Sequence, residues 1–161
     1  MGAGRFPTSQ TAYHNRFNMS IIKYLTKSEK QTFNLGKKIA KTLKGGEVLA
    51  LTGELGAGKT VLIKGIAAGL GIKKIITSPT FVLMKVYKLP ANKLSNLIHI
   101  DCYRAKSFQE IINIGAAEYF GRPDSIVVIE WAEKIKTILP KQRLEIQIGL
   151  KGENAREILI K

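Results

Sequence analysis

The sequence is poor in several features that mark other protein classes. Its one cysteine, Cys102, excludes an internal disulfide, and a reducing compartment is the simplest environment for such a chain. No uninterrupted apolar run approaches the ~20 residues that a membrane-spanning helix needs, so we expect no membrane segment. Aromatic residues make up only 7% of the chain and form no RNA-recognition signature.

Acidic residues are also scarce, because 12 Asp and Glu stand against 26 Lys and Arg, for a formal net charge of +14. Such an excess attracts nucleic acid, acidic protein faces or membrane surfaces. An equally simple interpretation is a lysine-rich composition with solvated surface lysines. The charge is spread along the chain and not gathered into one block, so both interpretations stay open.

The chain of 161 residues is long enough for one domain with a substantial core. Residues 1–18 lack acidic residues and periodicity, so we expect a disordered or leader segment there, whose composition resembles that of a transit peptide. A domain over 19–161 follows it. Apolar patterning predicts strands at 21–25, 47–52, 81–89, 97–103 and 126–129, and helices after Ser28, over 59–70 and over 107–114. Alternating residues from Leu144, with 157–160, predict a closing antiparallel pair.

One glycine-rich motif lies between the predicted strand at 47–52 and the helix that starts at Lys59. Glycines let backbone N–H groups converge on phosphates, the lysine brings a cation to the β and γ phosphates, and the threonine hydroxyl binds magnesium. The dipole of the following helix adds to the attraction. We therefore predict an ATP or GTP site formed by Gly53, Glu54, Leu55, Gly56, Ala57, Gly58, Lys59 and Thr60.

Two carboxylates follow apolar strands and are candidates for the magnesium side of this site. Glu130 ends the run 126–129, and Asp101 follows 97–100. Open α/β sheets bind ligands at the carboxyl ends of their strands, and hydrolytic phosphate-loop proteins need an acidic residue there. We therefore expect at least one of the two at the metal.

Four segments in this order resemble one family. GELGAGKT, SPTF at 78–81, HIDCYR at 99–104 and IEW at 129–131 are together similar to the TsaE (formerly YjeE) family of small bacterial ATPases of tRNA threonylcarbamoyladenosine biosynthesis. The resemblance covers about residues 20–161. It implies an α/β, P-loop NTPase-like three-layer domain with a mixed, partly antiparallel sheet.

The resemblance also implies a function. It is that of a cytoplasmic Mg²⁺-dependent ATP hydrolase, weakly active alone, which docks on the TsaB–TsaD complex and meets tRNA only indirectly. By motif matching, Lys59 contacts phosphate, Thr60 and Glu130 bind the metal, and Asp101 positions the attacking water or the hydration shell of the metal. Thr80 lies in a switch-like loop where γ-phosphate can be sensed. No motif that reads the base is evident, and the resemblance favours ATP over GTP.

Neighbouring residues leave alternatives open. Trp131 either lines the nucleotide site, anchors a partner or caps the sheet. Arg104 either neutralises phosphate charge, pairs with Asp101 or forms a plain surface salt bridge, and His99 is structural or hydrogen-bonds within the site. We expect Phe81 and Tyr103 to be packing residues.

Two other functions fit the phosphate loop. A small-molecule or nucleoside kinase needs an arginine-bearing lid, for which the segment 105–124 offers only Arg122. A nucleotide-gated RNA-binding module would use the +14 charge and would bind tRNA in a salt-dependent manner.

Overall fold

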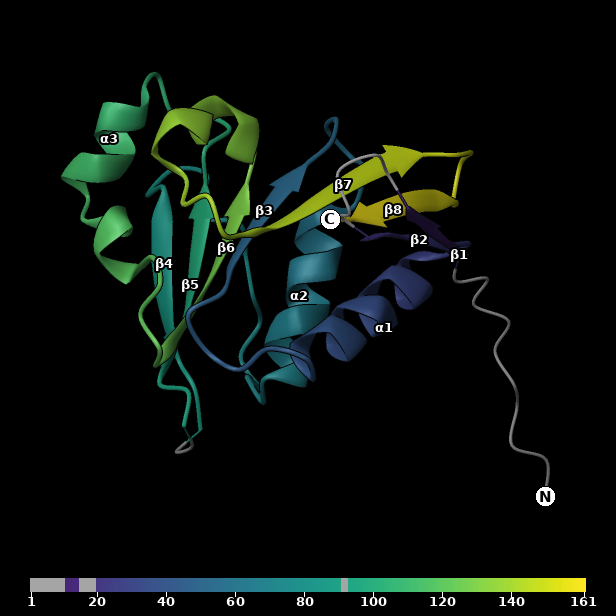
Figure 1. The fold of residues 1–161 in the computed structure, drawn as a ribbon, viewed down its shortest axis with the longest axis horizontal. Helices are drawn as coiled ribbons and strands as arrows, with labels where there is room; N and C mark the ends of the chain where they lie inside the picture. Colours follow the sequence, from purple (N-terminus) through teal and green to yellow (C-terminus); the bar gives the residue numbers. More distant parts are fainter. Residues whose placement is uncertain (1–10, 15–19, 91–92) are drawn as a thin grey trace.

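The fold is built on one mixed sheet. The computed structural model describes residues 11–14, 20–90 and 93–161. Within them an 8-stranded sheet has the order β1-β2-β8-β7-β3-β6-β5-β4 (Figure 1). The strands are β1 (Thr11–His14), β2 (Ser20–Thr26), β3 (Val48–Thr52), β4 (Met84–Lys88), β5 (Asn96–Asp101), β6 (Ser125–Glu130), β7 (Leu144–Leu150) and β8 (Arg156–Ile160).

The centre of the sheet is parallel and its edges are antiparallel. Strand β3 runs parallel to both β6 and β7, and β5 runs parallel to β6. Antiparallel pairs add β4 beside β5, β8 beside β7, β2 beside β8 and β1 beside β2. All residues of β5 and β6 are buried, as expected for parallel strands covered on both faces. The expected mixed, partly antiparallel sheet is confirmed.

Helices cover both faces of the sheet. Helices α1 (Glu29–Ala40) and α2 (Lys59–Gly69) pack on one face, where alternate residues of β3 such as Leu49 and Leu51 join their core. On the other face Val48 and Ala50 join a second core with α3 (Phe108–Asn113), η1 (Ala116–Tyr119) and η2 (Ala132–Ile138). This is the three-layer P-loop NTPase-like arrangement that the family resemblance implies. Within the described ranges, no helix is long and apolar enough to cross a membrane.

Helices α1 and α2 approach each other through glycines. A Cβ added at Gly65 would lie 2.0 Å from the Phe33 carbonyl oxygen, and one added at Gly36 would lie 2.3 Å from that of Leu62. Helix α1 begins at its cap Ser28, whose side chain accepts a hydrogen bond from the Gln31 N–H. The tight contact fixes α2, which carries the phosphate loop at its start.

The strand predicted over 81–89 is shorter than expected. It begins at Met84, because the preceding residues form a turn in which the N–H groups of Val82 and Leu83 both donate to the Pro79 carbonyl. Leu83 has a positive φ of 62°, which an extended strand does not allow. The strand predicted over 97–103 likewise ends early, at Asp101.

Strand β1 lies inside the segment 1–18 for which the sequence predicts no element. Its residues Thr11–His14 pair antiparallel with β2 at the edge of the sheet. Residues 1–10 and 15–19 lie outside the described residues, so the prediction of a leader or disordered segment over 1–18 stays a prediction.

Candidate nucleotide-binding site

The glycine-rich loop joins the carboxyl end of β3 to the first turn of α2. Gly53 and Gly58 have positive φ values of 144° and 102°, which favour glycine. At Gly53 a Cβ would also lie 2.3 Å from the Ile148 carbonyl oxygen. Because α2 starts at Lys59, its free N–H groups and positive dipole end face the loop. This geometry suits a bound phosphate.

The loop borders an open cleft of about 420 Å³. The cleft brings together nine of the residues predicted for the site: Leu55, Gly56, Gly58, Lys59, Thr60, Thr80, Asp101, Glu130 and Trp131. Three predicted residues do not line it. Gly53 and Glu54 turn their carbonyl oxygens to the Lys59 ammonium, and Ala57 is fully buried.

The Lys59 side chain is folded onto the loop. Its Nζ donates hydrogen bonds to the carbonyl oxygens of Gly53 at 2.5 Å and Glu54 at 2.9 Å, and it lies 4.0 Å from the centre of the Trp131 ring. Burial lowers the pKa of this ammonium from its ordinary value, and the carboxylate of Glu130 opposes the shift most strongly among nearby charges. A phosphate entering the cleft would offer the ammonium a better partner than two neutral carbonyls.

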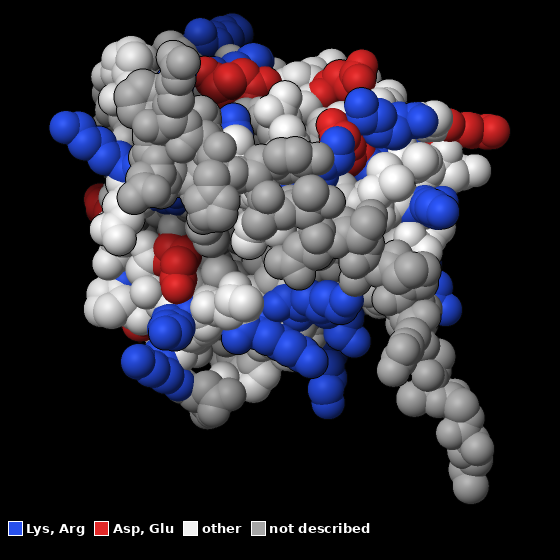
Figure 2. All heavy atoms as spheres, turned by 45° about the vertical axis from the view of Figure 1, so that its right-hand side comes forward, with Lys and Arg blue, Asp and Glu red and all other residues white. Residues whose placement is uncertain are grey.

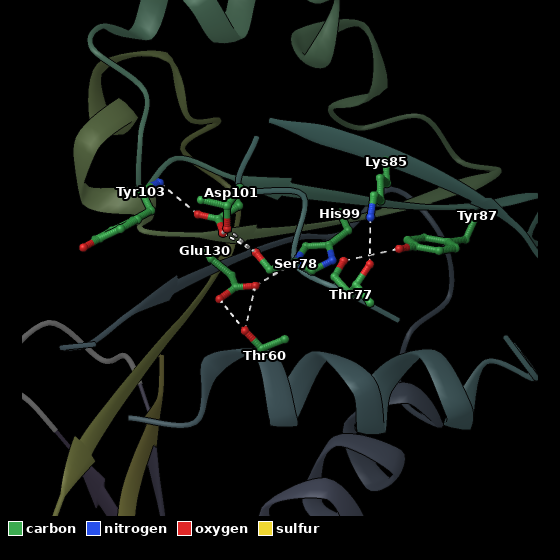
Figure 3. Close-up of polar contacts among 10 residues, drawn as sticks. Thr60, Thr77, Ser78, Lys85, Tyr87, His99, Asp101, Tyr103 and Glu130 are labelled. Carbon is green, nitrogen blue, oxygen red and sulfur yellow. Dashed lines mark hydrogen bonds and ion pairs between the residues drawn. The ribbon is translucent and has the colours of Figure 1, made fainter. Parts of the chain in front are cut away.

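Glu130 ends β6 as a buried carboxylate with two partners (Figure 3). The Thr60 hydroxyl donates to it, with Oγ1 2.9 Å from Oε2 and 3.2 Å from Oε1. His99 Nε2 lies 2.8 Å from Oε1, and His99 Nδ1 has no partner. The neutral tautomer with a proton on Nε2 fits both observations, because it donates to the carboxylate and leaves only an acceptor unpaired. Of the two alternatives for His99, the structure shows the hydrogen bond within the site.

Asp101 ends β5 beside Glu130, since the two residues are register partners across the β5–β6 pair. Its Oδ2 accepts hydrogen bonds from Ser78 Oγ and, at 2.8 Å, from Thr80 Oγ1. Its Oδ1 accepts one from the Tyr103 N–H at 2.8 Å (Figure 3). Asp101 therefore ties the loop that contains Thr80 to the end of the sheet.

Aromatic side chains border the cleft. Trp131 has a positive φ of 57°, and its ring centre lies 5.0 Å from that of Tyr103. The Arg104 guanidinium lies 4.6 Å from the centre of the Phe81 ring and does not bond to Asp101. The expectation that Phe81 is a packing residue is wrong, because 82% of it is exposed. Tyr103, 40% exposed, also lines the cleft and does not belong to the core.

Sequence reasoning missed two residues that hold the site. Ser78 bonds to Asp101 although 23 residues separate them, and its place in the SPTF segment was the available signal. Arg156, from β8, donates through Nε to the Ala57 carbonyl at 3.0 Å and through Nη2 to that of Gly56 at 3.5 Å. No local pattern marks Arg156, because its partners lie about a hundred residues away in the sequence.

The oxygens around Thr60 suit a magnesium ion. Mg²⁺ prefers hard oxygen ligands and usually keeps waters, taking one or two carboxylates plus substrate phosphates. The Thr60 hydroxyl and the Glu130 carboxylate are such ligands, and they touch each other at the mouth of the phosphate loop. In the described part of the chain, no group of three His, Cys, Asp or Glu residues is arranged to hold a metal unaided. The site therefore fits an ion that arrives with a nucleotide.

Comparisons with known proteins agree with this geometry. The family model described as "Threonylcarbamoyl adenosine biosynthesis protein TsaE" matches residues 26–158. Curated proteins named "tRNA threonylcarbamoyladenosine biosynthesis protein TsaE" are 40% identical in Bacillus subtilis, over 87% of this chain and 85% of that protein, and 37% identical in Treponema pallidum, over 86% and 99%. The structure described as "Crystal structure of Bacillus subtilus YdiB" superposes with a TM-score of 0.69 at 36% identity, covering 87% of this chain and 84% of that chain.

Proposed function

The chain belongs to the TsaE family of tRNA threonylcarbamoyladenosine biosynthesis proteins, and on this basis we propose that it is a Mg²⁺-dependent ATPase that supports this modification by docking on the TsaB–TsaD complex. The observation that carries the proposal is the cleft in which Lys59, Thr60 and Glu130 meet at the phosphate loop. Two of these residues are already hydrogen-bonded to each other across 70 positions of sequence.

In this proposal the phosphate loop binds ATP and the neighbouring side chains organise its hydrolysis. The N–H groups of the loop and the α2 terminus hold the phosphates, and Lys59 moves from the carbonyls of Gly53 and Glu54 to the β and γ phosphates. Thr60 and Glu130 would hold the magnesium ion, which when bound would supply positive charge to the transferred phosphoryl group. His99 keeps the Glu130 carboxylate oriented through the 2.8 Å contact.

Asp101 is the residue that we propose to position the attacking water. It is a carboxylate, 3% exposed, that lines the cleft beside Glu130. Its Oδ2 also accepts the Thr80 hydroxyl beside that of Ser78, so a γ-phosphate that draws Thr80 away opens one acceptor position on Oδ2 for water. This exchange couples nucleotide state to the loop that carries Ser78 and Thr80.

Exposed apolar side chains next to the cleft support docking of a protein partner. Leu55 is 70% exposed, Phe81 82% and Val82 59%, and Leu55 and Phe81 line the cleft itself. Exposed apolar residues grouped at one place mark interaction sites. A partner seated there would sense the nucleotide directly. In this account tRNA is bound mainly by the TsaB–TsaD complex, and the protein acts in the cytoplasm.

The kinase alternative needs an arginine over the phosphates, and Arg122 is the only candidate that the segment 105–124 offers for this role. Arg122, the one arginine of segment 105–124, pairs with Asp124 at 3.1 Å. It precedes β6, whose opposite end carries Glu130. Arg122 is therefore at the far end of the sheet and does not line the cleft, where a lid over the phosphates would have to place it.

The test is a reconstituted tRNA modification assay with the TsaB–TsaD pair. We expect the wild-type chain plus ATP to support repeated turnover, and Lys59→Ala to fail. Docking is tested separately by pull-down with and without ATP. Phe81→Ser is expected to weaken capture, whereas the control Ile75→Ser, equally exposed at 86% but outside the cleft, is not. Transfer of phosphate to a small acceptor instead of water would contradict the proposal.

A further inference from the structure

The positive charge of the chain has an uneven distribution that the composition conceals. Residues 30–46 and 55–100 contain twelve lysines and no Asp or Glu. The rest of the sequence holds fourteen basic and twelve acidic residues. Twelve of the fourteen net charges therefore belong to two segments, which contain most of α1, all of α2 and strand β4.

The fold brings the ends of these segments together. Helices α1 and α2 pack side by side and run in the same direction, since Gly36 faces Gly65 and Gly69 lies against Lys37 and Ala40. Their carboxyl ends therefore share one end of the molecule, where the β4–β5 connection also arrives (Figure 1). An open groove of about 420 Å³ lies there, with apolar walls and with Lys44 and Lys93 at its border.

The lysines at this end are exposed. The nearby Glu47 carboxylate accepts the N–H groups of Lys44 and Gly45, and across residues 11–14, 20–90 and 93–161 it forms no ion pair with an ammonium. Besides Lys44 and Lys93, the group contains Lys37, Lys38, Lys41, Lys73 and Lys74, all exposed. Figure 2 shows blue side chains gathered in the lower part of the molecule, with the red carboxylates mostly above them. Among the described residues, none of the seven ammonium groups has a carboxylate within ion-pair distance. Favourable interaction with the helix dipole explains a cation in the last turn, but not the lysines beyond both helices.

We propose that this lysine-rich end, formed by Lys37, Lys38, Lys41, Lys44, Lys73, Lys74 and Lys93, binds the phosphate backbone of tRNA directly. An array of cations without base-reading groups suits a phosphate backbone, where contacts position the nucleic acid without reading its sequence. The family acts in a tRNA modification pathway, so tRNA is the nucleic acid that this surface is expected to meet. The inference depends on family membership and not on the proposed ATP hydrolysis.

The position of this surface allows it to act together with the nucleotide cleft. Helix α2 carries the phosphate loop at one end and the lysine-rich end at the other, and its 11 residues span about 16 Å at ~1.5 Å per residue. The lysines therefore lie outside the nucleotide cleft, at the opposite end of the helix that carries the phosphate loop. The surface would guide tRNA toward the enzyme complex on which this chain sits.

The experiment compares two triple variants of equal net charge. Lys37→Gln/Lys41→Gln/Lys44→Gln removes three charges from the lysine-rich end. The control Lys106→Gln/Lys136→Gln/Lys141→Gln removes three exposed lysines from other parts of the surface. Filter binding measures the Kd for an unmodified tRNA transcript across a series of salt concentrations, and ATP binding by each variant verifies that it is folded.

The first variant should lower the slope of log K against log salt by about 2 to 3, because each lost phosphate contact removes ~0.7 to 0.9. It should also weaken binding at low salt by at least about tenfold, and the control should stay within about twofold of wild type. Equal losses in both variants would show that only net charge matters, and would overturn the proposal. So would the absence of tRNA binding by the wild type, or equally tight, lysine-dependent binding to phosphatidylglycerol vesicles. A variant that binds ATP but does not hydrolyse it should bind tRNA as the wild type does. Failure of the proposed ATP hydrolysis would therefore not affect this test.

Discussion

Replacing Gly65 with alanine should separate the two helices that support the phosphate loop. The new Cβ would lie 2.0 Å from the Phe33 carbonyl oxygen and 2.9 Å from its carbon, so backbone must move by more than about 1 Å. Overpacking of this kind costs roughly 1 to 3 kcal/mol of folding free energy. The cost at Gly65 should lie near the upper end of this range, because the neighbour is backbone and cannot rotate away. Alanine regains about 1 kcal/mol of helix propensity. The net loss is about 2 kcal/mol.

Thermal unfolding followed by circular dichroism measures this loss. For a domain of this size ~1 kcal/mol lowers the Tm by roughly 2 to 4 °C, so we expect a decrease of about 4 to 8 °C. ATP affinity should fall too, because α2 begins with Lys59 and Thr60. The control is Gly149→Ala, where a Cβ meets no atom within 4 Å and the Tm should not fall. A Gly65→Ala protein as stable as wild type would show that the contact between α1 and α2 accommodates a methyl group, and an equal loss in the control would show that the effect is not specific to this contact.

Three further perturbations address the site and its surroundings. Lys59→Ala should abolish hydrolysis and weaken ATP binding, and should alter the fluorescence of Trp131, the one tryptophan, whose ring lies 4.0 Å from the ammonium. An unchanged emission spectrum and ATP titration would contradict this. Asp101→Asn weakens charge-assisted hydrogen bonds to Ser78 and Thr80, so phosphate release should fall at least about tenfold with a smaller change in ATP affinity; full activity would remove Asp101 from the mechanism. Burial raises the pKa of the Cys102 thiol from its ordinary value of 9.0 to about 12, so the native thiol should resist a disulfide reagent that labels the unfolded chain. As the pH rises, the thiol loses its proton in the unfolded state at a lower pH than in the folded state. Its contribution to the free energy of unfolding is therefore full below pH ~9 and declines as the pH rises toward ~12. Cys102→Ala should lack this decline, and rapid labelling of the native thiol would contradict its burial.

The sequence predicts the centre of the site well because two simple rules govern it. The motif from Gly53 to Thr60 is local, and its place between a buried strand and a helix is readable from apolar periodicity. Asp101 and Glu130 follow apolar strands, and parallel neighbours end at the same edge of a sheet. Their adjacency in the β5–β6 pair follows from that rule.

The remaining features depend on contacts between distant parts of the chain. Arg156 holds the phosphate loop from β8, and no spacing connects the two. The turn after Pro79 exposes Phe81 and Val82, although their residue types favour a strand. The hydroxyls of Ser78 and Thr80 donate to Asp101 on both sides of Pro79, and tertiary contacts of this kind can override local propensity. The acid-free segments 30–46 and 55–100 are readable from the sequence, but the meeting of their lysines at one end of the molecule depends on the parallel packing of α1 and α2.

We propose that Glu130 and Thr60 hold the metal of an ATP-hydrolysing site, and a comparison of Glu130→Gln with the wild type tests this role directly. Steady-state phosphate release with Mg²⁺ and ATP is measured for the wild type and Glu130→Gln, beside ATP affinity without Mg²⁺. Loss of the metal ligand should remove about 3 kcal/mol of transition-state stabilisation, which lowers turnover by at least about 100-fold, while affinity without Mg²⁺ stays within about threefold. Wild-type turnover in Glu130→Gln would show that Glu130 does not hold a metal that hydrolysis needs.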